Sequence, residues 1–248
     1  MDLRQTYSAI YTEVSEYLGT GDIPVDRDLR KAQEIVWKGY RRFLRARNPE
    51  NGKRHYWSFL EKTSSLVLRQ GQWQYQLPAD FDKIKTKFNF SQNSNFTAMH
   101  SVSREAILQN RALSVTNTYP TKFCVVPTYT KETGKLNELW VYGDPNQNYV
   151  LSYSYYFIPP KLENDEEYFA GGDIFDECIL ACCLAEAEIK HTRAKGDMYG
   201  CAMESLAAAV LADQRTKPDG LGLNGDPGIH RVSVERPLPA IPEDEVYN

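Results

Sequence analysis

Apolar residues near the N-terminus recur every three or four positions, which is the spacing of an amphipathic helix. One helix is predicted over residues 4–18, and Gly19 and Gly21 end it. A second helix is predicted over residues 28–47. Asp26 or Asp28 can cap its start, and Asn48-Pro49 ends it because a residue before proline avoids helical backbone angles. The apolar stripe of this second helix consists of Leu29, Ala32, Val36, Tyr40, Phe43 and Leu44.

After the second predicted helix, apolar residues recur at every second position, which is typical of half-buried strands. Leu66 and Leu68 precede a turn at Gln70-Gly71, and apolar residues alternate with glutamines after it, which predicts a hairpin with one buried face. Ser103 is expected to cap a short helix that reaches about Leu113. The other alternating stretches predict strands at Ile84–Phe90, Lys122–Val126, Leu136–Tyr142 and Tyr149–Phe157.

Helical spacing returns after Pro159-Pro160. Asp173 is expected to cap a helix whose apolar face includes Cys178 and Cys182, Gly196 ends that helix, and an alanine-rich helix follows from Met198 to about Asp213. Helices, then strands, then helices indicate the α+β class. The simplest arrangement is a discontinuous helical bundle with an inserted antiparallel β domain. It assigns residues 1–55 and 170–215 to the bundle and 56–169 to the β domain.

Residues 216–248 differ in composition, with five Pro and four Gly in 33 residues. Such a segment cannot bury enough surface to fold alone. It is either a disordered end or an extended tail that adds a strand to another subunit. The apolar residues that would make such a contact are Ile229, Val232, Val234, Leu238 and Ile241.

Charge is distributed in two opposite blocks, although the 248 residues sum to −4. Residues 27–55 hold ten Lys or Arg against three acidic residues, and residues 161–190 hold nine Asp or Glu against two Lys. One interpretation of the basic block is contact with nucleic acid or with an acidic partner surface. The favoured interpretation is that the two blocks neutralise each other, within one chain or between copies.

Aromatic residues are abundant, with 16 Tyr, 10 Phe and 4 Trp, and such residues are favoured in strands and at interfaces. Together with the basic block they suggest candidates for a subunit interface. The aromatic candidates lie in predicted strands, and the basic candidates lie in the second helix: Trp73, Tyr75, Tyr153, Tyr155, Arg41, Arg42 and Arg45.

Motifs for catalysis, cofactor binding or metal binding are either missing or lack the secondary structure that they need on each side. The glycines at 220, 222 and 225 match G-x-G-x-x-G, but neither a strand before them nor a helix after them is predicted, as a dinucleotide site needs. The five Cys and four His show no metal-binding spacing and no nucleophile pair. We therefore expect no enzyme activity, no metal and no cofactor. The N-terminus does not read as a signal peptide, and no apolar run approaches membrane-spanning length, so no membrane partner is expected.

A series of short motifs resembles a known family. Trp57, Phe59 and Leu60 are followed by Gly71, Tyr75, Leu77, Pro78, Asp80 and Phe81, similar to the "W-F-L … G-x-x-x-Y-x-L-P-x-D-F" stretch of tailed-phage head-to-tail adaptor proteins, also called connector, neck or tail tubular A proteins. Pro120–Phe123, Leu139–Pro145, Tyr153–Pro160 and the helix from Phe175 resemble further family motifs in the same order. The resemblance covers residues 28 to 213.

This resemblance implies a structural protein of the virion neck, assembled in the host cytoplasm. It implies a ring, typically a dodecamer, that docks beneath the portal and receives tail or nozzle proteins. The ring would continue the DNA channel and make passing contact with genomic DNA. It also implies that residues 216–248 reach into the portal. The alternative is a DNA-binding or packaging-associated protein that uses the basic helix 28–47.

Overall fold

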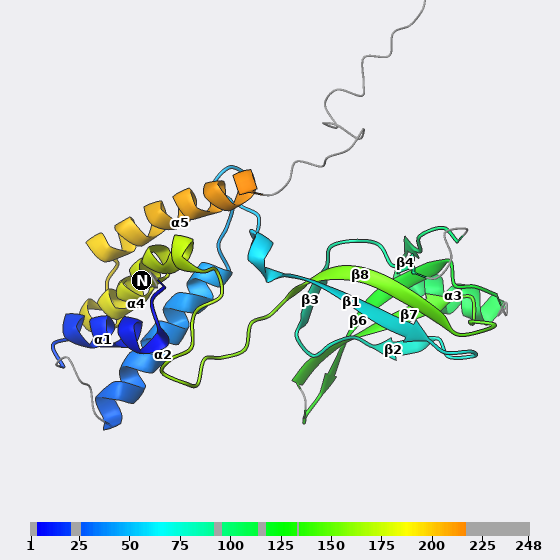
Figure 1. The fold of residues 1–248 in the computed structure, drawn as a ribbon, viewed down its shortest axis with the longest axis horizontal. Coiled ribbons are helices and arrows are strands. Elements are labelled where there is room, and N and C mark those ends of the chain that lie inside the picture. The colour runs from blue at the N-terminus through cyan, green and yellow to red at the C-terminus, as the bar shows by residue number, and fades with distance from the viewer. Residues whose placement is uncertain (1–3, 21–25, 92–95, 114–117, 133, 217–248) are drawn as a thin grey trace, which may run out of the picture.

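The fold is known from a computed structural model, which describes residues 4–20, 26–91, 96–113, 118–132 and 134–216. Four helices gather at one end of the molecule, and the strands with one short helix lie at the other (Figure 1). The α+β class predicted from the sequence is confirmed.

The helical end is built from four elements around one apolar core. Helix α2 packs against α1 and α4, and α5 packs against α4. Thr6 caps α1 by accepting a hydrogen bond from the Ala9 backbone N–H at 3.2 Å. Many of the buried side chains come from the predicted apolar stripes, for example Ile10, Val36, Tyr40 and Phe43, and Ile179 of α4 is buried with them. The bounds are α1 (Tyr7–Tyr17), α2 (Asp26–Leu44), α4 (Asp173–Thr192) and α5 (Asp197–Thr216).

Helices α2 and α4 approach each other at a glycine. A Cβ placed on Gly39 would lie 2.5 Å from the Cα of Cys183, closer than any real packing contact allows. Cys183 is buried in this contact, and Cys178 and Cys182 are buried in the same apolar core, as expected for thiols on an apolar helix face. The spacing of α2 and α4 therefore depends on the missing side chain at Gly39.

Two four-stranded sheets form the other end of the molecule. The first has the order β1-β8-β3, with β4 also paired to β8, and the second has the order β2-β7-β6-β5. Helix α3 (Arg104–Leu113) packs on β6 and β7. Its predicted cap is confirmed, because the Ala106 N–H donates to Ser103 Oγ at 3.2 Å. The strands are β1 (Glu61–Leu68), β2 (Gln74–Gln76), β3 (Phe81–Ile84), β4 (Asn89–Phe90), β5 (His100–Ser101), β6 (Lys122–Thr130), β7 (Gly134–Tyr142) and β8 (Tyr149–Phe157).

The two sheets share one apolar core. Alternate residues of β8 point into it, and residues of β2, β6 and β7 meet them from the other sheet. The ring of Phe88 lies 4.9 Å from that of Phe123 and 4.7 Å from that of Tyr153, measured between centroids. The aromatic content of the predicted strands therefore serves mainly to fill this core.

The predicted hairpin around Gln70-Gly71 is wrong. Strand β1 pairs with β8, where Leu66 lies opposite Leu151, and β2 pairs with β7, where Tyr75 lies opposite Leu139. The two strands of the expected hairpin thus belong to different sheets. The apolar alternation correctly identified the buried faces, but it carries no information about the partner strand.

Three smaller expectations are also corrected. The sheets are not purely antiparallel, because β5 pairs with β6 in parallel. Asp173 is the first residue of α4 rather than its cap, and Gly172 precedes it with φ 71°. Helix α2 ends at Leu44, before the predicted Asn48-Pro49. The following residues fold back on themselves, with the His55 N–H donating to Ala46 O at 2.8 Å.

Candidate interaction surfaces

One face of α2 carries a line of exposed cations. Residues spaced three or four apart share a helix face. On this face the cations are Arg27, Arg30, Lys38, Arg41 and Arg45, all exposed, together with the partly buried Lys31, and the exposed Glu34 lies among them. We call this set the α2 cationic face. Within the part of the chain that the structure describes, none of these six side chains forms a salt bridge. The charge of this face is therefore available to a partner.

Neutralisation of the basic helix by the acidic helix occurs at Arg42. Its guanidinium donates to the carboxylate of Glu186 on α4, at 2.9 Å from Nε, and stacks over the ring of Tyr199 at 5.0 Å. Burial tends to lower the pKa of Arg42, but the hydrogen bond and charge of Glu186 raise it above its ordinary value. The opposite arrangement also occurs, because Lys190 on α4 lies 3.8 Å from Glu34 on α2. The favoured pairing of the blocks thus holds for Arg42 and leaves the α2 cationic face unneutralised.

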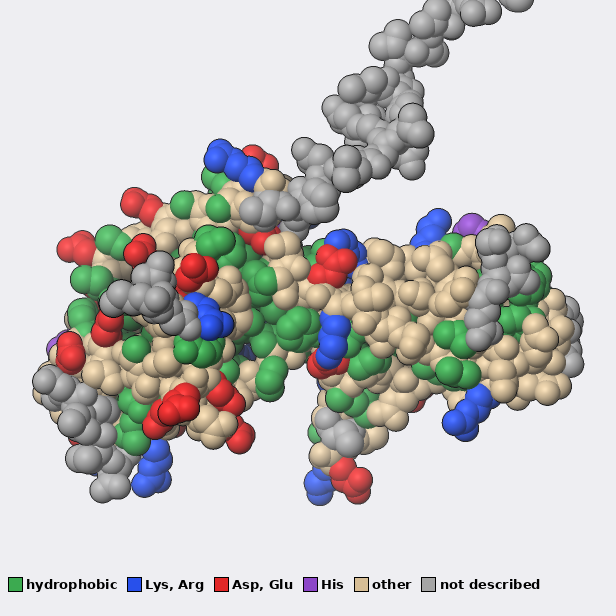
Figure 2. Space-filling model, viewed as in Figure 1, with side chains coloured by type: hydrophobic (Ala, Val, Ile, Leu, Met, Phe, Trp, Pro, Cys, Tyr) green, Lys and Arg blue, Asp and Glu red, His purple; other side chains and the backbone are tan. Residues whose placement is uncertain are grey.

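A cleft lies where the helices meet the strands, and we call it the junction cleft. Its volume is about 360 Å³. Arg41 and Arg45 of the α2 cationic face form part of its wall, together with Arg54 and Asp82, which pair at 2.9 Å. The apolar lining consists of Trp37, Leu44, Leu60, Phe157, Ile158 and Pro159, of which Ile158 is 53% exposed. The molecule is visibly narrowed between its two ends (Figure 2).

Sequence reasoning missed Trp37 and Ile158 as surface candidates. Trp37 falls next to the predicted core stripe, and Ile158 follows a strand directly. The available signal was an isoleucine placed between a strand and a Pro-Pro pair, a position where exposure is usual.

An acidic turn projects from the chain between β8 and α4. Glu163, Asp165 and Glu166 are exposed, and the carboxylate of Glu167 holds the turn by accepting from the Glu163 N–H at 2.8 Å and the Asn164 N–H at 3.2 Å. These hydrogen bonds lower the pKa of Glu167. We call residues 163–167 the acidic turn. The face of the helical end seen in Figure 2 carries more acidic than basic side chains.

The acidic turn is fixed to α1 through the backbone. The Tyr7 N–H donates to Glu167 O at 2.8 Å, and the Ser8 N–H donates to Asp165 O at 3.1 Å. The first N–H groups of a helix otherwise lack partners, so the turn satisfies two of them. The turn is consequently part of the folded helical end, although its carboxylates face solvent.

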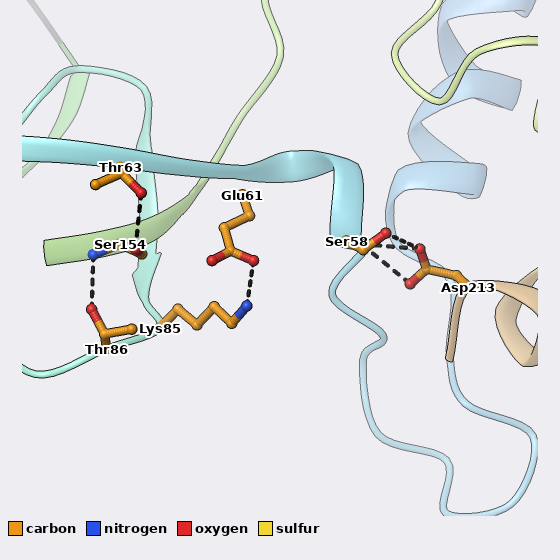
Figure 3. A network of polar contacts seen from close by, with 7 residues as sticks. All are labelled: Ser58, Glu61, Thr63, Lys85, Thr86, Ser154 and Asp213. Atoms are coloured by element: carbon orange, nitrogen blue, oxygen red, sulfur yellow. Dashed lines mark hydrogen bonds and ion pairs between the residues drawn. The ribbon is translucent and has the colours of Figure 1, made fainter. Parts of the chain in front are cut away.

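A buried polar network joins α5 to the start of the strands. The carboxylate of Asp213 on α5 accepts from the Ser58 N–H at 3.1 Å and from Ser58 Oγ at 2.5 Å (Figure 3). His55 Nε2 lies 2.7 Å from the same carboxylate. Ser58 belongs to a short 3-10 helix, η1 (Ser58–Leu60), which leads into β1. Nearby, Lys85 pairs with Glu61 at the first residue of β1. This network connects the last helix before residues 217–248 to the sheet.

Three of the side chains predicted for a subunit interface lie in the chain's own core. Tyr75 is 5%, Tyr153 2% and Tyr155 1% exposed. The hydroxyl of Tyr75 donates to Gln72 O at 2.6 Å, and that of Tyr155 donates to Asp80 Oδ1 at 3.0 Å. Their polar ends are satisfied within the chain, so these tyrosines cannot present a surface to a neighbouring copy.

The other interface candidates are accessible. Arg41 and Arg45 are exposed, and Arg42 is partly buried by Glu186. Trp73 is partly buried: its ring meets Trp140 edge-on at 5.2 Å and lies 4.2 Å below the guanidinium of Arg111. The structure does not bring Trp73 together with the arginines, because it lies among the strands and they lie on α2.

The motif residues that suggested the family are mainly buried side chains and a turn glycine. Trp57 is fully buried, and its indole N–H donates to Phe43 O at 3.1 Å. Gly71 adopts φ 73°, which favours glycine. Leu60, Leu77 and Phe81 are buried, while Phe59, Pro78 and Asp80 are partly buried. These residues therefore explain the fold and do not mark a binding surface.

The predicted docking residues of the C-terminal segment, Ile229, Val232, Val234, Leu238 and Ile241, lie outside the described residues. Among the residues that are described, no group of three or more His, Cys, Asp and Glu could hold a metal ion. In that same part of the chain, no helix has the length and apolar character needed to cross a membrane.

Comparison with known proteins gives one result. The profile of the SU10 adaptor protein family matches residues 5–221, which include every described helix and strand. No curated protein matches the chain. The family comprises phage structural adaptors, which are components of the virion and interact with other head and tail proteins. The match spans most of the sequence and agrees with the order of motifs, and the chain therefore belongs to the SU10 adaptor family of tailed-phage adaptors.

Proposed function

We propose that the chain assembles into a ring between the portal and the tail of a phage particle and continues the DNA channel there. A dodecamer is the expected ring, and tail or nozzle proteins are the expected partners on the side away from the portal. The observation that carries this proposal is the family match over residues 5–221.

The surface of the folded chain is consistent with a structural role. A ring subunit needs two different lateral faces, because each copy meets one neighbour on each side through a heterologous contact. This chain offers a basic face on α2 and an acidic turn on another element. The helical unit of residues 1–55 and 170–215 and the β unit of residues 56–169 then form parts of each ring subunit.

The C-terminal segment is assigned to portal docking within this proposal. It starts directly after α5, and its apolar residues alternate with polar ones around Val232 and Val234. An extended segment that orders on binding can follow a partner's surface over a long distance.

The test is the mass of the complex formed by the full chain with its portal protein. The proposal predicts a complex in which many copies of the chain bind one portal ring. The number of copies per portal ring should be the same in every complex. Failure of the chain to associate with the portal ring would contradict the proposal.

The exposed α2 cationic face also favours a second candidate, a DNA-binding or packaging-associated protein. Six cations on one helix face, with no salt bridge among the described residues, can neutralise phosphates, and such binding weakens steeply as salt rises. Binding of a short DNA duplex, measured at two salt concentrations, separates the candidates. Tight binding with a steep salt dependence and no binding to the portal would favour this second function.

A further inference from the structure

We infer that the α2 cationic face and the junction cleft beside it receive the acidic turn of a neighbouring copy of the same chain. The inference rests on the proposed ring and adds to it the two surfaces that meet. It assigns one lateral face of each subunit to α2 and the other to the turn at residues 163–167.

The receiving surface is hollow and mixed in character. A recess of about 390 Å³ is lined by Lys38, Arg41, Arg42, Arg45 and Glu186, and Arg41 and Arg45 also line the junction cleft. The two hollows therefore adjoin the same two arginines of α2. Arginines surround a lining that includes Trp37 and Ile158, and Arg and aromatic residues are the types enriched at protein interfaces.

The inserted element is acidic, exposed and held in shape by hydrogen bonds. Glu163, Asp165 and Glu166 are exposed, and no salt bridge neutralises them within the described residues, although Asp165 forms a side-chain hydrogen bond with Tyr11 of α1. Glu167 and the start of α1 fix the backbone of the turn through the hydrogen bonds described above. A turn that is already ordered loses little conformational entropy when it binds. Pairs of arginine and carboxylate orient the two binding partners and increase the rate at which they associate.

Charge complementarity favours a second copy over nucleic acid as the occupant. The chain carries both halves of the pairing, ten cations in residues 27–55 and nine acids in residues 161–190, and its net charge is −4. Within the chain, the α2 cationic face forms no salt bridge among the described residues, so its cations can pair with carboxylates of another molecule. A duplex would also leave the apolar lining of the junction cleft without a matching surface.

Zero-length crosslinking of the full chain tests this arrangement. A carbodiimide joins an amine to a carboxylate that touches it, and a mixture of ¹⁴N- and ¹⁵N-labelled chains identifies links between copies. We expect mixed-isotope links from Lys38 to Glu163, Asp165 or Glu166, both in the chain at high concentration and in its complex with the portal. Mixed-isotope links that join other surfaces in an assembled ring would overturn this inference and leave the proposed function intact. Absence of any assembly, with and without the portal, would overturn both.

Charge exchange provides a second, independent readout. The double variant Arg41→Glu with Arg45→Glu, and the double variant Asp165→Lys with Glu166→Lys, should each weaken self-assembly at least about tenfold, and an equimolar mixture of the two should restore part of it. The matched control Lys131→Glu with Lys135→Glu makes the same charge change at exposed positions near the β6–β7 turn and should assemble like the original chain. If Arg41→Glu with Arg45→Glu weakens duplex binding and leaves assembly unchanged, the α2 cationic face contacts nucleic acid and the inference is wrong.

Discussion

At the scale of single residues, two positions determine how closely the elements approach one another. Gly39 lets α2 touch the backbone of α4 at Cys183, and Asp213 ties α5 to the residues that lead into β1. Neither role is visible in the sequence, because a glycine inside a helix and an aspartate near a helix end have many possible causes. Both roles depend on neighbours that are more than a hundred residues away in the chain.

Gly39→Ala is expected to destabilise the fold. The added Cβ would lie 2.5 Å from the Cα of Cys183, and two helix backbones cannot separate without disturbing the core around Phe43. Overpacking of this kind costs about 1–3 kcal/mol. Urea denaturation measures the free energy of unfolding.

The matched control is Gly200→Ala on α5. Nothing lies within 4 Å of a Cβ at Gly200, so the alanine should be neutral or should stabilise the helix by about 0.5–1 kcal/mol. Equal effects of the two substitutions would show that α2 and α4 do not approach as closely as described.

Asp213→Asn is expected to lower the free energy of unfolding by about 2–4 kcal/mol, because the amide cannot accept all the hydrogen bonds of the carboxylate beside buried His55. Asp82→Asn removes a carboxylate whose partner Arg54 is largely exposed and should cost less than about 1 kcal/mol. Thermal unfolding of both variants is the measurement. A loss at Asp213 no larger than that at Asp82 would refute a structural role for the network.

At the scale of elements, the sequence predicted the helices and the longest strands well, and it failed on strand pairing. β8 was predicted with its observed bounds, because it is rich in tyrosine and its buried positions alternate from Tyr149 to Tyr155. The hairpin at Gln70-Gly71 failed because local turn residues suggested a local partner, whereas the core of the two sheets requires β1 to pair with β8. The interface tyrosines failed for a related reason. A tyrosine in a strand points to one of the two faces of the sheet. The neighbouring residues in the sequence do not indicate which of these faces a second sheet covers.

Tyr40 gives a pH-dependent test of the packing of α2. Burial raises the pKa of its hydroxyl to about 12, although the hydrogen bond from the Ala170 N–H at 3.1 Å tends to lower it. The pKa of tyrosine in an unfolded chain is about 10. The stabilisation from keeping Tyr40 neutral is therefore complete below about pH 10 and is lost as the pH rises from about 10 to 12.

Tyr40→Phe removes this titration and the hydrogen bond together. We expect the free energy of unfolding at neutral pH to fall by about 1 kcal/mol and its decline between about pH 10 and 12 to become shallower. Denaturation curves across that range measure both effects. Tyr129→Phe, at a side chain 76% exposed, should change neither, and an identical pH profile for Tyr40→Phe and the original chain would contradict the burial of Tyr40.

At the scale of the whole molecule, a near-neutral net charge conceals two opposite surfaces. Sequence reasoning identified the two blocks and the family, and the structure adds that Arg42 pairs with Glu186 while the α2 cationic face forms no salt bridge among the described residues. The ordered acidic turn and the junction cleft could not be predicted, since both arise where segments far apart in the sequence meet.

Removal of residues 217–248 separates the folded part from the proposed docking segment. Every described helix and strand lies within residues 4–216, so the truncated chain keeps all of them and should keep its melting temperature within about 2 °C. Binding to the portal should weaken strongly, as measured by co-sedimentation. Undiminished binding would refute the role of the segment.

The most direct test of the proposed adaptor role is a reconstruction of the assembled phage neck in which this chain can be traced. The proposed function predicts a closed ring of identical copies between portal and tail, around the DNA channel, with the α2 cationic face of each copy against the acidic turn at residues 163–167 of the next. A reconstruction in which this chain forms no ring at that position would contradict the proposed function.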